Sequence, residues 1–215
     1  MGATVKSRRS YESPKRREQA HATRMGILEA ATELFLERGY VRTTIEAIAR
    51  RAGTSPETIY ATFRNKRTLL SELMDVAIAG DDRPVPILDR DWVEAMRNET
   101  DPGRRVRILA RNGRLILERR TPIDEVLRGA AAADPDMADL WRRTRDQRHA
   151  GQATLVRILA AGGALRPGVT REAAADVLFA VGSPETYQSL VVERGWSPQR
   201  FERWYAETIE RLLLR

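Results

Sequence analysis

The 215-residue chain contains no cysteine, and its only two histidines are His21 and His149. The lack of cysteine excludes disulfide bonds, zinc ribbons and cysteine nucleophiles. Two histidines are too few for a histidine-rich metal site. We therefore expect neither a metal site nor a cofactor in this protein.

Long hydrophobic runs are also lacking. The longest apolar stretches, such as Val177–Val181, fall far short of the roughly 20 consecutive apolar residues that span a bilayer. The polar, basic N-terminus has no apolar segment typical of a secretory signal. These absences predict a cytoplasmic protein without a membrane partner.

Positive charge is concentrated at the N-terminal end of the chain. The net charge is +7, from 37 Lys and Arg against 30 Asp and Glu. Residues 1–70 carry 14 basic and 7 acidic side chains, which leaves 23 of each sign in residues 71–215. A basic end on a neutral body indicates contact with a polyanion, although a solubilising tail would give the same balance.

Residues 1–14 are polar and lack a hydrophobic period, so we predict a flexible basic arm. Its basic side chains are Lys6, Arg8 and Arg9. Arms of this composition bind phosphates or enter a minor groove, but a tail without a defined contact is an equal alternative.

Apolar residues then recur with helical spacing in four segments, the first from about Lys15 to Arg38 and the fourth over residues 66–79. The boundaries carry residues that favour helix ends: Gly39 after the first helix, the capping-box sequence TTIE at 43–46 before the second, Gly53 after it, Ser55 and Pro56 at the start of the third, and Asn65 before the fourth. Residues 15–80 are thus predicted to form one helical head.

The loop at residues 80–86 (GDDRPVP) is rich in helix breakers and is the candidate boundary between this head and a body at residues 81–215. The body is expected to be helical throughout. Its predicted helices are 89–98, 102–119, 121–132, 135–161, 170–193 and 198–214. The fold class is therefore all-α, with a three-helix head joined by a fourth helix to a helical body.

Residues 43–66 combine two short helices and a tight turn. Ala49 is small where the two helices must cross, and Gly53 permits a left-handed backbone conformation in the turn. Ile48 and Ile59 supply the apolar contact between the helices. This arrangement is typical of a helix-turn-helix and favours DNA binding, although a helical hairpin could show the same spacing by chance.

The same segment resembles the N-terminal signature of TetR-type regulators. The resemblance covers roughly residues 20–75 and is carried by Gly39, Tyr40, Thr43, Thr44, Ile45, Ile48, Ala49, Ala52, Gly53, Ser55, Thr58, Ile59, Tyr60, Phe63, Asn65, Lys66 and Leu69. The sequence departs from the common pattern at Thr54, Glu57 and Thr62, which lie on or beside the expected reading face. The resemblance implies an all-helical homodimer that binds DNA and usually holds a small-molecule effector.

The helix that begins at Ser55 is expected to enter the major groove of double-stranded DNA. The predicted DNA-binding residues are Thr43, Thr44, Ser55, Pro56, Glu57, Thr58, Tyr60, Thr62 and Lys66. Ser55, Glu57, Thr58 and Thr62 are candidates for base edges. Glu57 could equally be a first-turn residue that complements the helix dipole.

The other members of this set are candidates for phosphate contacts. Thr43 and Thr44 suit a phosphate oxygen at a helix start, while simple helix capping is their alternative role. Tyr60 and Lys66 resemble the phosphate-contacting pair of the family, and Tyr60 could instead belong to the core. Nearby arginines are expected to contribute general electrostatic attraction.

Two further sites in the body are predicted, mainly by the resemblance. The expected dimer interface comprises Val177, Leu178, Val181, Tyr187, Leu190, Phe201, Trp204, Tyr205, Ile209 and Leu212, although packing within one chain would give the same stripes. The expected ligand pocket comprises Trp92, Met96, Leu109, Asn112, Leu115, Ile116, Trp141, Thr144, Arg145 and His149, any of which could instead be an ordinary core or surface residue.

The sequence therefore predicts a homodimeric repressor that binds a palindromic operator and is released by a small molecule. An activator with the same head and a non-specific architectural DNA-binding protein are the alternatives. An enzyme is disfavoured, since no phosphate-binding glycine loop, nucleophile elbow, HExxH motif or recognisable carboxylate pair occurs.

Overall fold

The computed structural model describes residues 14–215, which form an all-helical fold and confirm the predicted fold class. The predicted arm lies almost entirely outside the described residues. The helices are α1 (Pro14–Arg42), α2 (Ile45–Ala52), α3 (Pro56–Phe63), α4 (Lys66–Ala79), α5 (Asp91–Asn98), α6 (Pro102–Ala131), α7 (Pro135–Leu159), α8 (Arg171–Val181), α9 (Pro184–Tyr187) and α10 (Pro198–Leu213). Short 3₁₀ turns at Ile87–Asp89 and Ala161–Gly163 and a π turn at Gln188–Glu193 complete the described elements.

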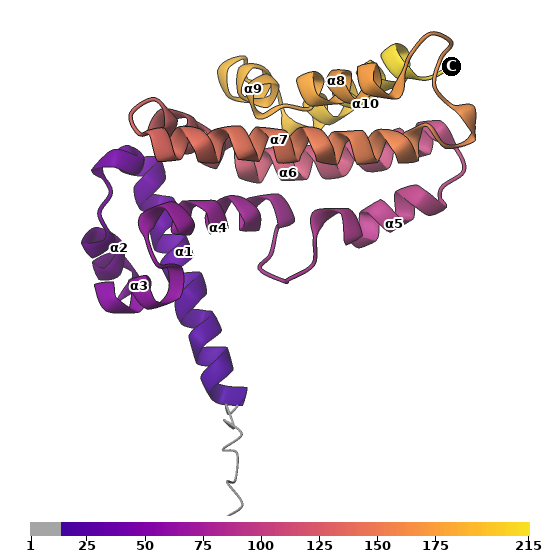
Figure 1. Cartoon of the computed structure of the whole chain (residues 1–215). Coiled ribbons are helices and arrows are strands. Elements are labelled where there is room, and N and C mark those ends of the chain that lie inside the picture. The colour runs from indigo at the N-terminus through magenta and orange to yellow at the C-terminus, as the bar shows by residue number, and fades with distance from the viewer. Residues whose placement is uncertain (1–13) are drawn as a thin grey trace, which may run out of the picture.

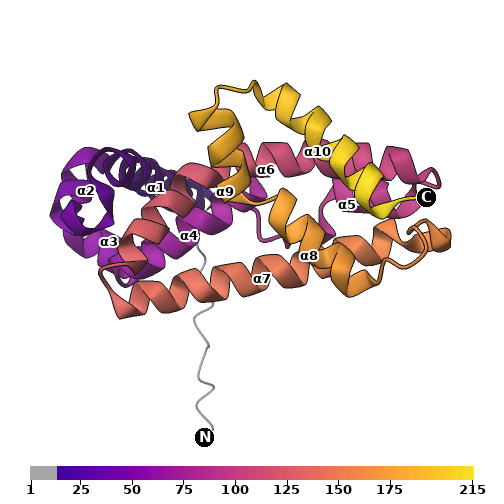
Figure 2. The same ribbon diagram turned by 90° about the horizontal axis from the view of Figure 1, so that it is seen from above.

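The long helices α6 and α7 run side by side through the middle of the molecule (Figure 1). Helices α4 and α5 lie on one face of this pair, and α8, α9 and α10 cover the other. Seen from above, α10 lies over α6 and α8 lies beside α7 (Figure 2). Helices α1, α2 and α3 form a head at one end, from which α4 leads into the body.

The helix ends of the head follow the predicted capping residues with one exception. Gly39 has φ 74° and ends the regular part of α1, and Gly53 has φ 64° and ends α2. Ser55 and Asn65 cap α3 and α4 with their side-chain oxygens. The exception is α2, whose cap is Thr44, because the Thr44 hydroxyl accepts a hydrogen bond from the backbone N–H of Ala47.

The predicted break between residues 119 and 121 is wrong, since α6 continues through Pro122. Proline removes one backbone donor and normally disrupts a helix interior. Leu117 and Ile123 are both buried on either side of it, and they belong to two different hydrophobic clusters. Tertiary packing along the whole helix therefore outweighs the local cost of the proline.

The predicted helix at 170–193 is also wrong as a single element. It ends at Val181 and restarts at Pro184, where Ser183 accepts a hydrogen bond from the backbone N–H of Thr186. The combination of a serine cap with proline in the first turn favours a new helix start. This local signal was present in the sequence and outweighs the apolar periodicity that spans it.

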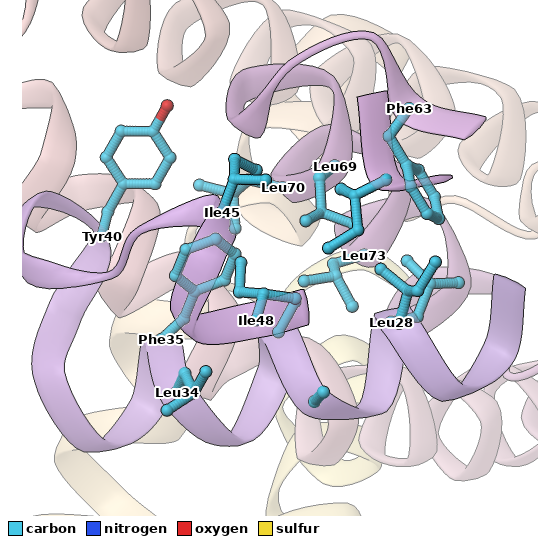
Figure 3. Packing of buried hydrophobic residues seen from close by; sticks show 14 of the residues in the cluster. Leu28, Leu34, Phe35, Tyr40, Ile45, Ile48, Phe63, Leu69, Leu70 and Leu73 are labelled. Carbon is cyan, nitrogen blue, oxygen red and sulfur yellow. The ribbon is translucent and has the colours of Figure 1, made fainter. Parts of the chain in front are cut away.

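The described residues form two hydrophobic clusters. The first fills the head, where Phe35, Ile48, Leu69 and Leu70 meet from α1, α2 and α4 (Figure 3). It also includes Ile123, Leu127, Ala130 and Met137 from α6 and α7. The second fills the body between α5, α6, α7, α8 and α10. The head core therefore extends across the predicted boundary at residue 80, because the end of α6 packs against it.

Within residues 14–215, no helix combines the length and the apolar character needed to cross a membrane.

Candidate nucleic-acid interface and interior cavity

The turn between α2 and α3 has the geometry of a helix-turn-helix. Ala49 is buried, and its carbonyl oxygen accepts a hydrogen bond from the backbone N–H of Thr54 at 3.0 Å. Gly53 adopts the left-handed conformation that the turn requires. Ile48 and Ile59 are fully buried between the two helices. The small residue, the glycine and the apolar pair therefore have the positions that the sequence predicts for them.

Helix α3 buries one face and exposes the other. Ile59 and Phe63 are fully buried in the head core, whereas Glu57, Tyr60 and Thr62 are exposed. The exposed fraction of Tyr60 is 49%, which excludes the alternative of a buried core position for this side chain. Within residues 14–215, the polar face of α3 is therefore uncovered, and it is free to contact a binding partner.

Hydrogen bonds fix the first turn of α3. The Ser55 hydroxyl accepts a hydrogen bond from the backbone N–H of Thr58 at 3.3 Å and lies 3.2 Å from the Thr58 hydroxyl. The Thr62 hydroxyl donates to the carbonyl oxygen of Thr58 at 2.8 Å. Pro56 occupies the first turn, where its missing N–H costs little. These bonds hold three candidate base-reading hydroxyls along one helix face.

Glu57 is exposed in the same turn. Hydrogen bonds donated by the Ser55 hydroxyl and by the backbone N–H of Glu57 lower the pKa of the Glu57 carboxyl. The carboxylate is therefore anionic at neutral pH and sits at the positive end of the helix dipole. Both roles predicted for Glu57, base contact and helix stabilisation, are compatible with this position.

The two threonines before α2 differ in a way that corrects the prediction for Thr43. Thr43 is fully buried, and its hydroxyl donates to the carbonyl oxygens of Leu34 at 3.1 Å and Gly39 at 2.8 Å. Its side chain therefore holds the end of α1 and is unavailable to a phosphate. Thr44 is exposed at the start of α2, and it remains a candidate for a phosphate contact.

Lys66 has an internal role that the sequence did not indicate. Its ammonium group donates to the carbonyl oxygens of Tyr40 at 2.9 Å and Thr43 at 2.8 Å, and it lies 4.2 Å from the centroid of the Tyr40 ring. Two of its three N–H donors are thus used within the head. Burial lowers the pKa of this lysine. A phosphate contact by the remaining donor stays a prediction.

A cavity of about 760 Å³, partly open to solvent, lies between the head and the body, and Arg24 of α1 is part of its lining. Its walls come from α4, the loop at residues 81–88, α5, α6 and α7. Gly182 and Tyr205 close it on the side of α8 and α10. This volume falls in the range of about 300–1,000 Å³ typical of small-molecule sites.

The predicted pocket residues divide into two groups. Trp92, Leu109, Ile116 and Thr144 line the cavity. Met96, Asn112, Leu115, Trp141, Arg145 and His149 lie outside the cavity wall, so their assignment is wrong. Met96 is instead a core residue of the body, and His149 pairs with Asp176 at 2.9 Å. The error arose because sequence position gives the region of a pocket but leaves the orientation of each helix undetermined.

Sequence reasoning missed the polar residues of the cavity, above all Arg120, Arg148, Gln152 and Tyr205. A signal for part of this set existed. Thr144, Arg148 and Gln152 follow one another at intervals of four residues, so they project from one face of α7.

Tyr205 fits the interior because the residues packed against it from α6 and from the end of α8 are glycines, which have no side chain. A Cβ atom at Gly182 would lie 2.3 Å from the Tyr205 hydroxyl oxygen, and one at Gly113 would lie 3.0 Å from its ring. Burial raises the pKa of this phenol, so Tyr205 stays neutral at any physiological pH. Its position inside the chain removes it from the predicted dimer interface.

Four other predicted interface residues are also buried within the chain, and we correct their assignment. They are Leu178, Tyr187, Phe201 and Ile209. Their stripes pack against α6 and one another, which is the alternative that the sequence left open. Val177, Val181, Leu190 and Trp204 are partly buried, while Leu212 and the unpredicted Val192 are exposed by 46% and 60%.

Comparisons with known proteins agree with this geometry. Residues 27–73 match the family described as bacterial regulatory proteins, tetR family. The HTH-type transcriptional regulator TtgR of Pseudomonas putida is 44% identical over 59 residues, which cover 27% of this chain and 28% of TtgR. The uncharacterised HTH-type regulator YdeS of Bacillus subtilis is 30% identical over 131 residues, 61% of each chain. The chain thus spans less than two thirds of these curated relatives.

The solved structures extend the likeness to the whole chain. NalD, the secondary repressor of the MexAB-OprM multidrug efflux pump in Pseudomonas aeruginosa, superimposes with a TM-score of 0.69 at 25% identity, covering 92% of this chain and 98% of NalD. Residues 27–73 therefore match the N-terminal head of the tetR family, and the chain has the all-helical fold of NalD.

Proposed function

We propose that the protein is a sequence-specific DNA-binding repressor that acts as a homodimer and is released from its operator by a small molecule. The observation that carries the DNA-binding part is the exposed polar face of α3, held on a rigid, buried helix-turn-helix core. The relatives named as transcriptional regulators support the same function.

A homodimer is proposed because one reading helix is short. Helix α3 has eight residues, and a single recognition helix contacts few base pairs. Two heads on a palindrome multiply the discrimination between sequences. The exposed apolar side chains of Val192 and Leu212 and the half-buried Trp204 offer contact area for a second copy.

Ligand relief is supported by the double role of α4. Leu69, Leu70 and Leu73 pack into the head core, while Met74 and Val76 of the same helix line the cavity. A ligand in the cavity would therefore touch the helix that supports α2 and α3. A shift of α4 would change the spacing of the two α3 helices in a dimer, which must match successive major grooves.

The end of α4 is also tied directly to the body. The Arg119 side chain on α6 donates to the carbonyl oxygens of Ala77 at 2.9 Å and Ile78 at 3.3 Å. These carbonyls lack partners within the helix because they belong to its last turn. A displacement of α6 by a ligand would thus be transmitted to α4 through Arg119.

The test is selection of binding sites from a random duplex library, with affinity then measured against salt concentration. We expect a palindrome whose half-sites are about one helical turn or more apart. Binding without an enriched sequence and with only a steep salt dependence would favour an architectural protein instead. No binding would overturn the proposal. Whether the operator overlaps a promoter or lies upstream of it then separates repressor from activator.

A further inference from the structure

We propose that the cavity between α4, α6 and α7 binds an amphipathic organic anion, whose charged group lies against Arg148 and Gln152 and whose apolar part contacts the aliphatic wall. This inference rests on the proposed ligand-relieved function and adds the chemical class of the ligand to it.

Arg148 is a half-buried cation without a carboxylate partner. Its Nη1 donates to the carbonyl oxygen of Phe179 at 2.7 Å, and its guanidinium carbon lies 3.6 Å from the centroid of the Phe179 ring. Among residues 14–215, no carboxylate oxygen lies within 4.0 Å of its nitrogens. Burial and the charge of Arg120 lower the pKa of Arg148 to about 10, so it remains protonated at neutral pH. An anion beside it would offset the cost of this desolvated charge.

The acidic side chains nearest to Arg148 already have arginine partners. The Asp124 carboxylate accepts hydrogen bonds from Arg120 at 2.6 and 3.1 Å, and Glu185 pairs with Arg145 through Oε1, while its buried Oε2 has no hydrogen-bond partner among the described residues. Three guanidinium groups against two carboxylates leave one positive charge in excess in this group. The local balance therefore favours an anionic ligand over a neutral or cationic one.

Gln152 provides a polar group beside Arg148. It follows Arg148 by four residues on α7, so both side chains project from the same helix face into the cavity. Its Oε1 is buried and has no hydrogen-bond partner in the described part of the chain. Rotation of the amide exchanges its oxygen and nitrogen, which can then present an N–H to an anion. A bound carboxylate would satisfy this group and Arg148 together.

The rest of the cavity wall is suited to an apolar moiety. Leu109, Ile116 and Leu117 line it from α6, and Leu140 and Leu155 line it from α7. The aliphatic side chains and the arginine thus belong to one continuous cavity. A ligand with a charged end and a hydrocarbon or aromatic body matches both parts.

The opposite wall of the cavity carries acidic side chains, which by themselves would favour a cationic ligand. Asp81 pairs with Arg90 at 2.7 Å, and Asp82 lies 3.0 Å from the imidazole of His21. Asp75 on α4 is exposed to water, and partial desolvation and the charge of Glu72 raise the pKa of its carboxyl. Solvation by water reduces the need of the exposed Asp75 for a counter-ion, whereas Arg148 is half-buried and has no carboxylate partner.

The experiment compares three probes that share one apolar body, namely 4-butylbenzoate, 4-butylbenzamide and 4-butylbenzylammonium, by isothermal titration calorimetry with the full chain and no DNA. We expect the benzoate to bind about 10-fold or more tightly than the amide, as a charge-assisted hydrogen bond implies, and the ammonium to bind least. Arg148→Gln should reduce the benzoate affinity to that of the amide. Arg142→Gln, which changes an exposed arginine of α7 that does not line the cavity, should preserve the preference.

Gln152→Glu is the second variant, in case Arg148→Gln does not fold. It keeps the side-chain shape and adds a negative charge, so it should weaken benzoate binding about 10-fold and leave amide binding unchanged. Preference for the ammonium, equal affinity for all three probes, or no binding of any would overturn the proposal. DNA binding is measured separately by fluorescence anisotropy without ligand, so failure of the repressor function would be visible independently.

Discussion

The Lys66 ammonium group donates a hydrogen bond to the carbonyl oxygen of Thr43 at 2.8 Å, across 23 residues of sequence. The carbonyl lies between α1 and α2, and the lysine begins α4. A single side chain thus joins the helix that leads into the body to the start of the helix-turn-helix. The position of α2 relative to α4 therefore depends on a residue predicted from the sequence to contact phosphate only.

We predict that Lys66→Met lowers the free energy of unfolding by about 1–3 kcal/mol, because it removes a charged donor from two backbone carbonyls while it keeps the aliphatic stem. Urea denaturation of the full chain measures the change. The matched control is Arg50→Met, which alters an exposed cation on α2. Equal stability of the Lys66 variant and the wild type would show that these hydrogen bonds contribute nothing.

Thr58 and Tyr60 are expected to have different roles at the DNA. We predict that Thr58→Ala changes the preferred operator sequence, because its hydroxyl lies in the first turn of α3 beside Ser55. Tyr60→Phe should weaken binding to all sequences alike, because its exposed hydroxyl is suited to a phosphate. Competition binding to a set of single-base operator variants separates the two. A uniform loss with Thr58→Ala would contradict its role in base reading.

Gly182 is predicted to be intolerant of a side chain. Gly182→Ala would place a Cβ atom 2.3 Å from the Tyr205 hydroxyl oxygen, so we expect a loss of about 1–3 kcal/mol in the free energy of unfolding. Tyr205→Phe in the same chain should recover part of the loss, because it removes the closest atom. Thermal denaturation of the two single variants and the double variant provides the measurement.

The control for this pair is Gly129→Ala, where a new Cβ atom meets nothing within 4 Å in α6. This change should raise the free energy of unfolding by about 0.5–1 kcal/mol, since alanine loses less backbone entropy in a helix. If Gly182→Ala were as harmless as Gly129→Ala, the close packing of α8 against Tyr205 would be refuted.

Asp81 should make stability depend on pH in the acidic range. Hydrogen bonds from Arg90 above all, and from Arg83, hold the pKa of the Asp81 carboxyl below its ordinary value of about 3.9. Because the folded pKa is lowered, the stabilisation is complete above pH about 3.9 and is lost as the pH falls toward the folded pKa. Asp81→Asn should therefore lower the Tm at pH 6 and differ progressively less from the wild type below pH about 4.

The measurement is the Tm of both chains across this range. Asp89→Asn serves as the control, because Asp89 is exposed in the same loop region. A Tm difference between the two chains that stayed constant down to the lowest pH would show that the Asp81–Arg90 pair does not contribute to the loss of stability at acidic pH.

Local sequence signals were sufficient to predict the head. Gly39, Gly53, Ser55 and Asn65 each end or begin a helix at the predicted residue. The reason is that capping depends on the chemistry of one residue and the N–H or C=O groups within the next turn. The burial of Ile59 beside the exposure of Glu57, Tyr60 and Thr62 also follows from the 3.6-residue period.

The sequence by itself therefore determined the all-α class, the helix-turn-helix and the exposed polar face of α3, because these depend on period and capping within short segments. Tertiary structure alone decided that α6 continues through Pro122, that Lys66 holds the Thr43 carbonyl, and that Arg148 and Tyr205 meet in one cavity. An amphipathic stripe gives the direction of a helix face but leaves open which neighbour covers it. That choice depends on packing between α6, α7 and α10, whose contacts join residues far apart in the chain.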